Sequence, residues 1–411
     1  MSLFIDENYI GFSNDVYLIT GYSRHCIYEL KNGNLVSINS ETKSLLEMCF
    51  TDEEIDLSLD TEQLTIINKF LDIGVLSKYD NNTFLTKNHN IYNIPKNKGD
   101  IKFAWIEVTR ACNHACTFCY LDLDSTHMNL TEYKKTLNEL KGLGIKNIQI
   151  IGGEPLILGD VLVEMLSYSQ KLEMNVEIYT NGTLLDEKWI GVIKNFGIRI
   201  ALSLHSHTPS IHNTLTKSRK GYEKTNVAIE LLRKNNIEHR VSGVNVIDSN
   251  DSTNSEVVIK FEPPRATNKA IGKLYNYELF KRKAITRNSF YRPLKKEQVI
   301  SSASGHQCFS EMLYISADLD VFPCVMERRI SHGNIKNKLL QEVIDENIMG
   351  LNKDSVNECN LCEYRYACFD CRPDSLGQSV NSKPWYCTYS PKEGEWIDPE
   401  SYYNSISNFL N

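Results

Sequence analysis

The middle of the chain alternates short apolar runs that favour β-strands with longer amphipathic runs of helical period. The expected strands span residues 101–108, 147–151, 175–179, 198–204, 239–247 and 256–263. The expected helices span residues 130–143, 161–172, 186–195 and 222–234. Strands that alternate with helices of this length predict parallel βαβ units in an α/β fold. Such units place ligand-binding loops at the carboxyl ends of the strands.

One connection departs from this pattern. Only about eight residues, rich in Ser, Asn, Asp and Thr, separate the fifth and sixth expected strands. A crossover between parallel strands usually needs about a dozen residues or more. We therefore expect the fifth helix to be missing and assign no cofactor contact near Val244 and Asn245. Arg265, just beyond the sixth strand, is a candidate pocket residue.

The first hundred residues carry a different pattern. Three expected strands, two helical patterns, a short strand and a linker follow one another at residues 16–20, 26–30, 35–38, 41–49, 61–71, 75–77 and 87–99. An Asn-Gly pair between the second and third strands predicts a hairpin turn. This order resembles the small winged-helix, RRE-like domains, which implies that an extended leader peptide binds by strand addition. An accessory domain with only a packing role is the alternative.

Size and charge narrow the class of protein. The 411 residues are enough for two or three domains, and the net charge of −7 argues against a protein that mainly binds nucleic acid. The sequence shows neither an apolar run long enough to span a membrane nor a signal peptide. We therefore expect a cytoplasmic protein with thiols or metal ligands rather than disulfides. Cys26 and Cys49, in apolar surroundings, are expected to be ordinary buried thiols.

Three cysteines stand close together just after the first of the alternating strands. Cys112, Cys116 and Cys119 form a C-x3-C-x2-C loop, with Phe118 before the third cysteine. Three soft thiolates can ligate three irons of a [4Fe–4S] cluster. The fourth iron, without a ligand from this loop, is then open to a small molecule. A zinc site or a disulfide loop is the alternative, although zinc favours four ligands arranged in pairs.

This loop resembles the cluster-binding motif of the radical S-adenosylmethionine (SAM) enzymes. The resemblance implies that the open iron chelates the amino and carboxylate groups of SAM. It implies that the reduced cluster cleaves SAM to a 5′-deoxyadenosyl radical, which abstracts hydrogen from the substrate. It further implies a partial (β/α)6 barrel over residues 96–270 and an external electron donor such as flavodoxin or ferredoxin.

Polar motifs after the next strands are similar to those of the same family. A GGEP-like motif, which in the family receives the amino group of SAM, is formed by Gly152, Gly153, Glu154 and Pro155. Its glycines permit a close backbone approach, and its carboxylate can pair with a cation. The resemblance also places Asn181 and Ser203 near the ribose of SAM. His205 and His207 stand where relatives often carry an acidic residue. Either could act on substrate, but we expect each to be an ordinary surface or core histidine.

Seven further cysteines lie in the last third of the chain, at Cys308, Cys324, Cys359, Cys362, Cys368, Cys371 and Cys387. Their core spacing, C-x2-C-x5-C-x2-C, resembles the SPASM domain, whose usual last interval is one residue longer. The resemblance implies two auxiliary [4Fe–4S] clusters, one on Cys308, Cys324 and Cys371 and the other on Cys359, Cys362, Cys368 and Cys387. Seven thiolates leave one iron open or bound by another ligand. A zinc ribbon on Cys359, Cys362, Cys368 and Cys371 is the alternative, because paired C-x2-C units suit zinc.

Together these features resemble the radical SAM/SPASM peptide maturases, such as the grasp-with-spasm type. The implied domains are a leader-binding domain (1–95), the barrel (96–270), and a bridging region with a SPASM domain (271–411). The implied reaction is hydrogen abstraction from a ribosomally made precursor peptide, followed by an oxidative C–C, C–O or thioether crosslink. The alternatives are a formylglycine-generating enzyme of the anaerobic sulfatase-maturing type and a non-catalytic, metal-containing peptide-binding protein. The basic segment 269–296 could line a groove for an acidic peptide or form a solvated helix face.

Overall fold

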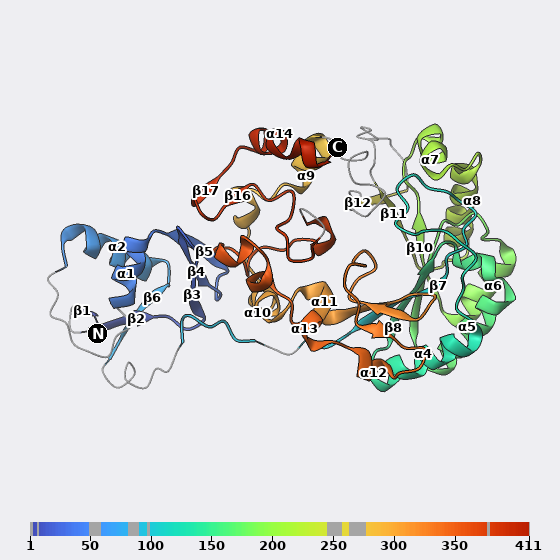
Figure 1. Cartoon of the computed structure of the whole chain (residues 1–411), viewed down its shortest axis with the longest axis horizontal. Helices are drawn as coiled ribbons and strands as arrows, with labels where there is room; N and C mark the ends of the chain where they lie inside the picture. The colour runs from blue at the N-terminus through green and yellow to red at the C-terminus, as the bar shows by residue number, and fades with distance from the viewer. Residues whose placement is uncertain are drawn as a thin grey trace.

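The computed structural model describes residues 3–5, 8–48, 59–80, 90–96, 99–244, 257–262, 277–375 and 379–410. Figure 1 shows an elongated molecule, with the N-terminal elements at one end and a large sheet with its helices at the other. The C-terminal segments lie between these two ends. Among the described residues, none of the helices is long and apolar enough to cross a membrane.

Within the described ranges, the barrel part of the large, nine-stranded sheet consists of six adjacent parallel strands. They are β7 (Phe103–Thr109), β8 (Asn147–Gly152), β9 (Asn175–Thr180), β10 (Arg199–Ser203), β11 (His239–Val244) and β12 (Ile259–Glu262). Each strand pairs in parallel with the next, for example through Ile106 and Ile150, and through Val241 and Ile259. The predicted α/β partial barrel is therefore confirmed. The predicted loss of the fifth helix, together with Asn245 and Arg265, lies outside the described residues.

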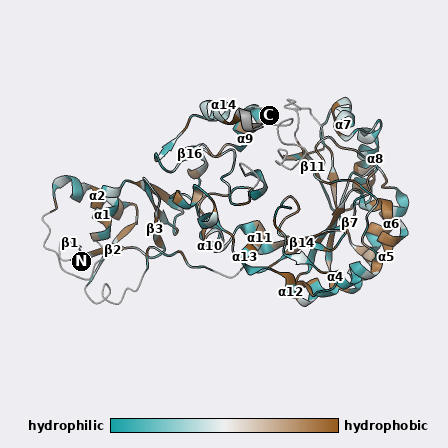
Figure 2. Cartoon of the chain, in the orientation of Figure 1, coloured by the Kyte–Doolittle hydropathy of each residue, from teal (hydrophilic) through white to brown (hydrophobic). Residues whose placement is uncertain are grey.

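Helices cover one face of this sheet. The expected helices form as α4 (Leu130–Gly142), α5 (Asp160–Lys171), α6 (Glu187–Phe196) and α8 (Gly221–Lys234), and α7 (Pro209–Thr216) is an additional one. Figure 2 shows both hydrophobic and hydrophilic residues on α5 and α6, as expected for helices that bury one side. Ile106, Ile150 and Ile178 pack against the helices in one apolar core. In each of these strands the residues next to the isoleucine face the barrel interior, because side chains alternate along a strand.

The sheet continues with three further strands on the side of β7 that faces away from β8. The added strands are β13 (Met312–Ile315), β14 (Asp320–Phe322) and β15 (Gly333–Asn334). β13 pairs in parallel with β7, whereas β14 and β15 continue in antiparallel pairs. The sequence pattern did not predict these strands. They fasten the C-terminal region to the strand that leads into the Cys112 loop.

The N-terminal region contains the predicted hairpin and helices. Its elements are β1 (Leu3–Ile5), β2 (Asn8–Phe12), β3 (Val16–Thr20), β4 (His25–Glu29), β5 (Asn34–Ile38), α1 (Ser40–Glu47), α2 (Thr61–Asp72) and β6 (Leu76–Tyr79). β3, β4 and β5 form one antiparallel sheet, and β1, β2 and β6 form another. β6 is the expected short strand, whereas β1 and β2 were not predicted. Ile10, Leu18, Leu46 and Phe70 belong to the apolar core between the two sheets and the helices.

The hairpin sheet also packs on the C-terminal region. Tyr17 and Tyr28 share an apolar cluster with Tyr364 and Tyr389. The Tyr28 hydroxyl donates to the carbonyl oxygen of Glu363 at 3.0 Å. The Tyr22 backbone N–H donates to the carbonyl oxygen of Leu361 at 2.8 Å. The N-terminal region is thus in direct contact with the segment that carries Cys359 and Cys362.

Short elements make up the C-terminal region. They are α9 (Tyr277–Lys283), η3 (Arg287–Phe290), α10 (Lys296–Ser304), α11 (Gln307–Glu311), α12 (Leu340–Val343), α13 (Glu346–Met349), η4 (Lys353–Ser355), η5 (Cys359–Leu361), η6 (Arg372–Asp374), β16 (Tyr389–Ser390), β17 (Glu395–Trp396) and α14 (Pro399–Leu410). The basic segment 269–296, where described, is not simply a solvated face. Phe280 is fully buried, and Lys283, whose side chain is 7% exposed, forms an ion pair with Asp374 at 2.5 Å.

Candidate functional site

The cysteine loop follows β7 and is held from two sides by backbone hydrogen bonds. On one side, Ala115 N–H donates to the carbonyl oxygen of Thr216 at 3.2 Å, and Thr117 N–H donates to that of Leu215 at 2.9 Å. Both acceptors belong to the last turn of α7, where helix carbonyl groups lack partners within the helix. The unpredicted helix α7 therefore fixes the position of the loop.

The thiols of this loop lie within electrostatic reach of one another. Burial is the main cause that raises the pKa of Cys112 to about 11, and the charges of Glu154 and Cys119 raise it further. Burial also raises the pKa of Cys116 to about 12, with additional increases from Cys119 and Cys112. Such mutual effects require neighbouring sulfurs, which is the arrangement that a cluster needs. The assignment of Cys112, Cys116 and Cys119 as cluster ligands stays a prediction.

The GG pair of the GGEP-like motif touches the start of the cysteine loop. Gly152 has a φ of +148°, and a Cβ at this position would lie 2.2 Å from the carbonyl oxygen of Thr109. A Cβ at Gly153 would lie 2.2 Å from the carbonyl oxygen of Ala111. Gly153 N–H donates to Thr109 and Glu154 N–H to Ala111, each at 2.8 Å. Both glycines are thus required for the contact between the end of β8 and the loop.

Glu154 is a fully buried carboxylate at the junction of β8 and β9. It accepts hydrogen bonds from Leu156 N–H at 3.1 Å, from the Thr180 hydroxyl at 2.7 Å and from Asn181 N–H at 2.8 Å. Burial raises the pKa of Glu154, and these three donors oppose that shift. Pro155 begins the short helix η2 (Pro155–Leu158). Glu154 therefore joins two strand ends beside the loop, and its contact with SAM, like that of Pro155, stays a prediction.

Asn181 directly follows β9, and Ser203 is the last residue of β10. Both residues therefore lie at the carboxyl-end edge of the sheet. The Asn181 amide donates to the side-chain oxygen of Asn113, directly after Cys112, at 2.8 Å. The Asn113 amide donates in turn to the Thr183 hydroxyl at 2.8 Å. Ser203 pairs with Ser242 of β11. The structure thus brings Asn181 to the cysteine loop, whereas the contacts of both residues with SAM stay predictions.

A pair of stacked histidines supports Phe118. The rings of Phe118 and His205 meet edge to face at 4.7 Å, and those of His205 and His212 stack at 5.6 Å. The backbone N–H of His205 donates to His212 Nδ1 at 3.1 Å, and the backbone N–H of Val244 donates to His205 Nδ1 at 3.0 Å. Burial lowers the pKa of His205 to about 3 and that of His212 to about 4. Both rings are therefore neutral at pH 7, and His205 is a packing residue, as predicted.

His212 was not among the predicted site residues. It lies on α7, which the sequence pattern did not reveal, and is only 1% exposed. His207, for which we expected an ordinary surface or core histidine, precedes α7. Its ring lies 6.3 Å from that of Phe261 on β12.

A polar network on the inner face of the sheet was also missed. Trp105 Nε1 donates to the side-chain oxygen of Gln149 at 2.8 Å, and the Gln149 amide donates to Glu177. Arg240 pairs with Glu177 at 2.8 Å. The sequence pattern could have revealed this network, because Gln149 and Glu177 alternate with buried apolar residues in β8 and β9. A small number of polar groups in a cavity can fix the orientation of a ligand.

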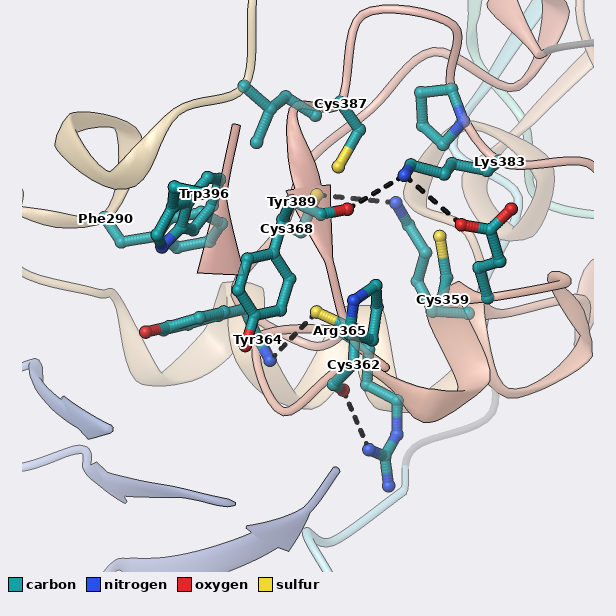
Figure 3. Close-up of a pocket in the computed structure, with 15 residues that line it drawn as sticks. Phe290, Cys359, Cys362, Tyr364, Arg365, Cys368, Lys383, Cys387, Tyr389 and Trp396 are labelled. Carbon is teal, nitrogen blue, oxygen red and sulfur yellow. Dashed lines mark hydrogen bonds and ion pairs between the residues drawn. The ribbon is translucent and has the colours of Figure 1, made fainter. Parts of the chain in front are cut away.

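A separate pocket in the C-terminal region brings four cysteines together. Its empty volume is about 400 Å³. Figure 3 shows the sulfurs facing a common space from the side chains of Cys359, Cys362, Cys368 and Cys387. Burial raises the pKa of Cys359 to about 12 and that of Cys368 to about 11, and in both thiols the charge of Cys387 raises the pKa further. This is the set that the SPASM resemblance implied for one auxiliary cluster, although ligation itself stays a prediction.

The other C-terminal cysteines occupy different elements. Cys308 lies on α11 and Cys324 follows β14, while Cys371 precedes η6 outside the lining of the four-cysteine pocket. The zinc-ribbon alternative would need Cys371 in place of Cys387. Within the part of the chain that the structure describes, no three His, Cys, Asp or Glu side chains are placed to hold a single metal ion. Ligation of a second cluster by Cys308, Cys324 and Cys371 stays a prediction.

Several known proteins are similar to this chain. The AdoMet-dependent heme synthase of Methanosarcina barkeri is 22% identical over 70% of this chain and 96% of its own length. The subtilosin biosynthesis protein AlbA of Bacillus subtilis is 28% identical over 34% of this chain and 32% of its length. The cysteine-type anaerobic sulfatase-maturating enzyme of Clostridium perfringens is 30% identical over 36% of this chain and 45% of its length. The chain thus spans less than half of the last two relatives.

One solved structure shares the fold over most of the chain. It is Streptococcus suis SuiB bound to the precursor peptide SuiA, with a TM-score of 0.56 and 14% identity. The match covers 91% of this chain and 98% of that one, and it establishes a shared fold.

The strongest identification comes from the barrel. Residues 106–257 match the model of the Radical SAM superfamily. This range includes the cysteine loop, the GG pair, His205 and His212. Enzymes of this superfamily use SAM and a [4Fe–4S] cluster. The chain therefore contains a radical SAM domain.

Proposed function

We propose that this chain is a peptide maturase, which abstracts hydrogen from a ribosomally made precursor peptide and installs an oxidative crosslink. The observation that carries the peptide assignment is a groove between the N-terminal hairpin and the C-terminal region. Its empty volume is about 1410 Å³, and its lining includes Leu35, Val36 and Ser37 of β5. In the described residues β5 pairs only with β4 and so forms an edge of its sheet.

An edge strand along a groove can bind an extended peptide. The backbone groups along such an edge can offer the hydrogen bonds of strand addition, and side-chain pockets supply selectivity. In β5 the carbonyl oxygen of Ser37 already accepts from the Arg24 guanidinium at 3.4 Å, which a bound strand would have to displace. The opposite wall of the groove carries the aromatic residues Phe290, Tyr291 and Trp396. Arg24, Arg287 and the carboxylate of Glu395 also line it, and the net positive charge of this lining favours a peptide with acidic residues. This supports the leader-binding role that the N-terminal pattern predicted.

The chemistry would take place at the cysteine loop. Cys112, Cys116 and Cys119 would hold the cluster, and the motif 152–155 with Asn181 and Ser203 would contact SAM. When bound, the cluster and SAM supply the radical that abstracts hydrogen. The residues of this chain fix that centre, because α7 and β8 hold the loop by backbone hydrogen bonds. A hydrogen must be held close to the reacting carbon, so rigid positioning of this loop contributes to rate.

The C-terminal cysteines would hold auxiliary clusters. The four-cysteine pocket offers a complete set of soft ligands for one [4Fe–4S] cluster. Cys308, Cys324 and Cys371 would hold the second with three protein ligands. An external flavodoxin or ferredoxin would supply electrons. The similarity to AlbA and to SuiB, which was solved with its precursor peptide, supports a peptide substrate.

A matched pair of tyrosines tests the peptide groove. Tyr291 lines the groove and is 68% exposed, whereas Tyr22 is 65% exposed and lies outside its lining. Truncation of an aromatic anchor commonly costs about 1–2 kcal/mol of binding. We therefore expect Tyr291→Ala to weaken precursor binding by about five- to thirtyfold in fluorescence anisotropy, and Tyr22→Ala to leave binding unchanged. Equal affinities of both variants and the wild type would contradict the groove assignment.

The sulfatase-maturating relative favours a second candidate function, the oxidation of a cysteine or serine to formylglycine. The two reactions leave different products. A crosslink joins two residues and removes the fragment ions between them in tandem mass spectrometry. Formylglycine is an aldehyde that reacts with a hydrazide probe. A non-catalytic binding protein would yield neither product, and anaerobic iron and sulfide counts would show no cluster.

A further inference from the structure

Two pockets of the C-terminal region share a wall. The four-cysteine pocket lies on one side, and a second pocket of about 440 Å³ lies on the other, lined by residues that include His306, Cys308 and Asp370. Lys353 and Cys368 line both pockets. A charge on Lys353 therefore acts on whatever group either pocket holds.

Lys353 is a buried lysine beside a candidate ligand. It begins η4 and is 5% exposed. Its ammonium nitrogen lies 3.5 Å from Cys368 Sγ, to which it donates a hydrogen bond, and 2.5 Å from the carboxylate of Asp370. The sulfur and the carboxylate are thus bridged by one cation.

The charge of Lys353 is not balanced by Asp370 alone. Arg372 also pairs with Asp370, and its guanidinium is held by the carbonyl oxygens of Val380 at 2.9 Å and Ser382 at 3.1 Å. Among the described residues, two cations thus share this carboxylate, which leaves one positive charge next to Cys368. Burial of an uncompensated ammonium costs several kcal/mol. A four-iron cluster with four thiolates carries net negative charge and would supply the missing partner.

We propose that Lys353 raises the reduction potential of the auxiliary cluster on Cys359, Cys362, Cys368 and Cys387 by donating to the sulfur of Cys368. This inference rests on the proposed function, which places a cluster in that pocket. Hydrogen bonds to cluster sulfurs and nearby positive charge both stabilise the reduced, more negative state. Lys353 is a positioning residue in this sense, because it acts through a ligand.

Three variants at the shared wall test this inference in anaerobically reconstituted protein. Lys353→Met removes the charge and keeps the side-chain length, Lys353→Arg keeps the charge, and Lys283→Met is the matched control. Lys283 is also a buried lysine with a carboxylate partner at 2.5 Å, but it lines neither pocket. The readout is a mediated redox titration followed by electron paramagnetic resonance of the auxiliary cluster.

We expect Lys353→Met to lower the ratio of reduced to oxidised cluster about tenfold at a fixed potential, which is 59 mV for one electron. Lys353→Arg should retain most of the wild-type potential, and Lys283→Met all of it. Asp370→Asn should shift the potential in the opposite direction, because it removes a negative charge from the same wall. This variant carries the test if Lys353→Met fails to bind iron.

The outcomes separate this inference from the function on which it rests. Unchanged potentials in Lys353→Met and Asp370→Asn, both with the wild-type iron content, would overturn the role of Lys353 alone. A wild-type protein that binds iron only at the Cys112 loop would instead overturn the auxiliary cluster. Precursor modification is measured separately by mass spectrometry in each variant.

Discussion

Gly153 shows how little space separates the cysteine loop from the end of β8. An added Cβ would lie 2.2 Å from the carbonyl oxygen of Ala111, so either β8 or the loop must move. The hydrogen bond from Glu154 N–H to the same carbonyl oxygen would be disturbed. We expect Gly153→Ala to lower the rate of SAM cleavage at least about tenfold, or about 1.4 kcal/mol in activation free energy. The measurement is 5′-deoxyadenosine formation under a strong reductant.

Gly191 provides the matched control for this substitution. It lies inside α6, and an added Cβ there meets no atom within 4 Å. Alanine in a helix interior is favoured over glycine by about 0.5–1 kcal/mol. Gly191→Ala should therefore retain SAM cleavage with equal or higher stability. Equal rates in both variants would mean that the loop tolerates displacement and that the contact has no role in the reaction.

Protonation of His212 makes the free energy of unfolding of the metal-free protein depend on pH. Burial lowers its pKa to about 4, with a further decrease from the charge of His114 and an opposing effect of Glu223, whereas the pKa in the unfolded chain is near 6.5. The unfolded state therefore binds more protons between these values, and stability falls as the pH decreases through this range. The loss from this group is at most about 1.4 kcal/mol per pH unit.

Replacement of this histidine should flatten the response. In His212→Asn the amide oxygen can still accept the hydrogen bond from His205 N–H, but the side chain no longer titrates. We expect the free energy of unfolding in urea to depend less on pH between 6.5 and 4 than in the wild type. His127→Asn removes an imidazole from an exposed position and serves as the control. An unchanged pH dependence in His212→Asn would contradict the buried, neutral state of this ring.

At the scale of single elements, α7 ends in a conformation that its sequence does not favour. Lys217 is the C-cap, with φ 52° and ψ 36°, in the left-handed region. This conformation costs about 1–2 kcal/mol for a residue with a Cβ, whereas glycine adopts it readily. Lys217→Gly should therefore stabilise the protein by up to about 1 kcal/mol, visible as a higher midpoint of urea unfolding.

The control for Lys217→Gly is the same substitution at a lysine in a regular helical turn. Lys234 ends α8 with its backbone in the helix. Glycine at this position should destabilise by about 0.5–1 kcal/mol, because it has more freedom in the unfolded chain. Changes of the same sign in both variants would show that the C-cap of α7 is not strained. The rate of SAM cleavage reports whether the cysteine loop, which α7 holds, shifts with the cap.

The elements also show which parts of the fold were predictable. β7 to β11 and their helices follow from local alternation, since each buries one apolar face against the next unit. β13 carries no comparable signal, because its position depends on pairing with β7, about 200 residues earlier in the chain. α7 was missed although Thr208 followed by Pro209 is a usual helix-start signal, because the helix has only eight residues and gives little apolar periodicity to detect. The grouping of Cys359, Cys362, Cys368 and Cys387 around one pocket was predictable from the resemblance of their spacing. By contrast, His212 and Lys353 become neighbours of the sites only through folding.

At the scale of the whole molecule, the hairpin sheet and the C-terminal region share one apolar cluster. Tyr28 is fully buried in it and donates to Glu363, next to Cys362. Removal of residues 1–90 would expose this cluster, so such a deletion tests leader binding and folding together. A point substitution that keeps the chain intact separates these effects better.

Tyr28→Ala tests whether the two regions are stabilised together. Loss of a large buried aromatic side chain costs about 3–5 kcal/mol. We expect faster hydrogen exchange, followed by mass spectrometry, in peptides from residues 16–38 and also in those from residues 359–367. Tyr22→Ala, at an exposed position in the turn between β3 and β4, should change neither. Faster exchange confined to the first ninety residues would show that the N-terminal region folds independently. Faster exchange in both sets of peptides would mean that the wall of the four-cysteine pocket depends on the same packing that positions β5 for a peptide.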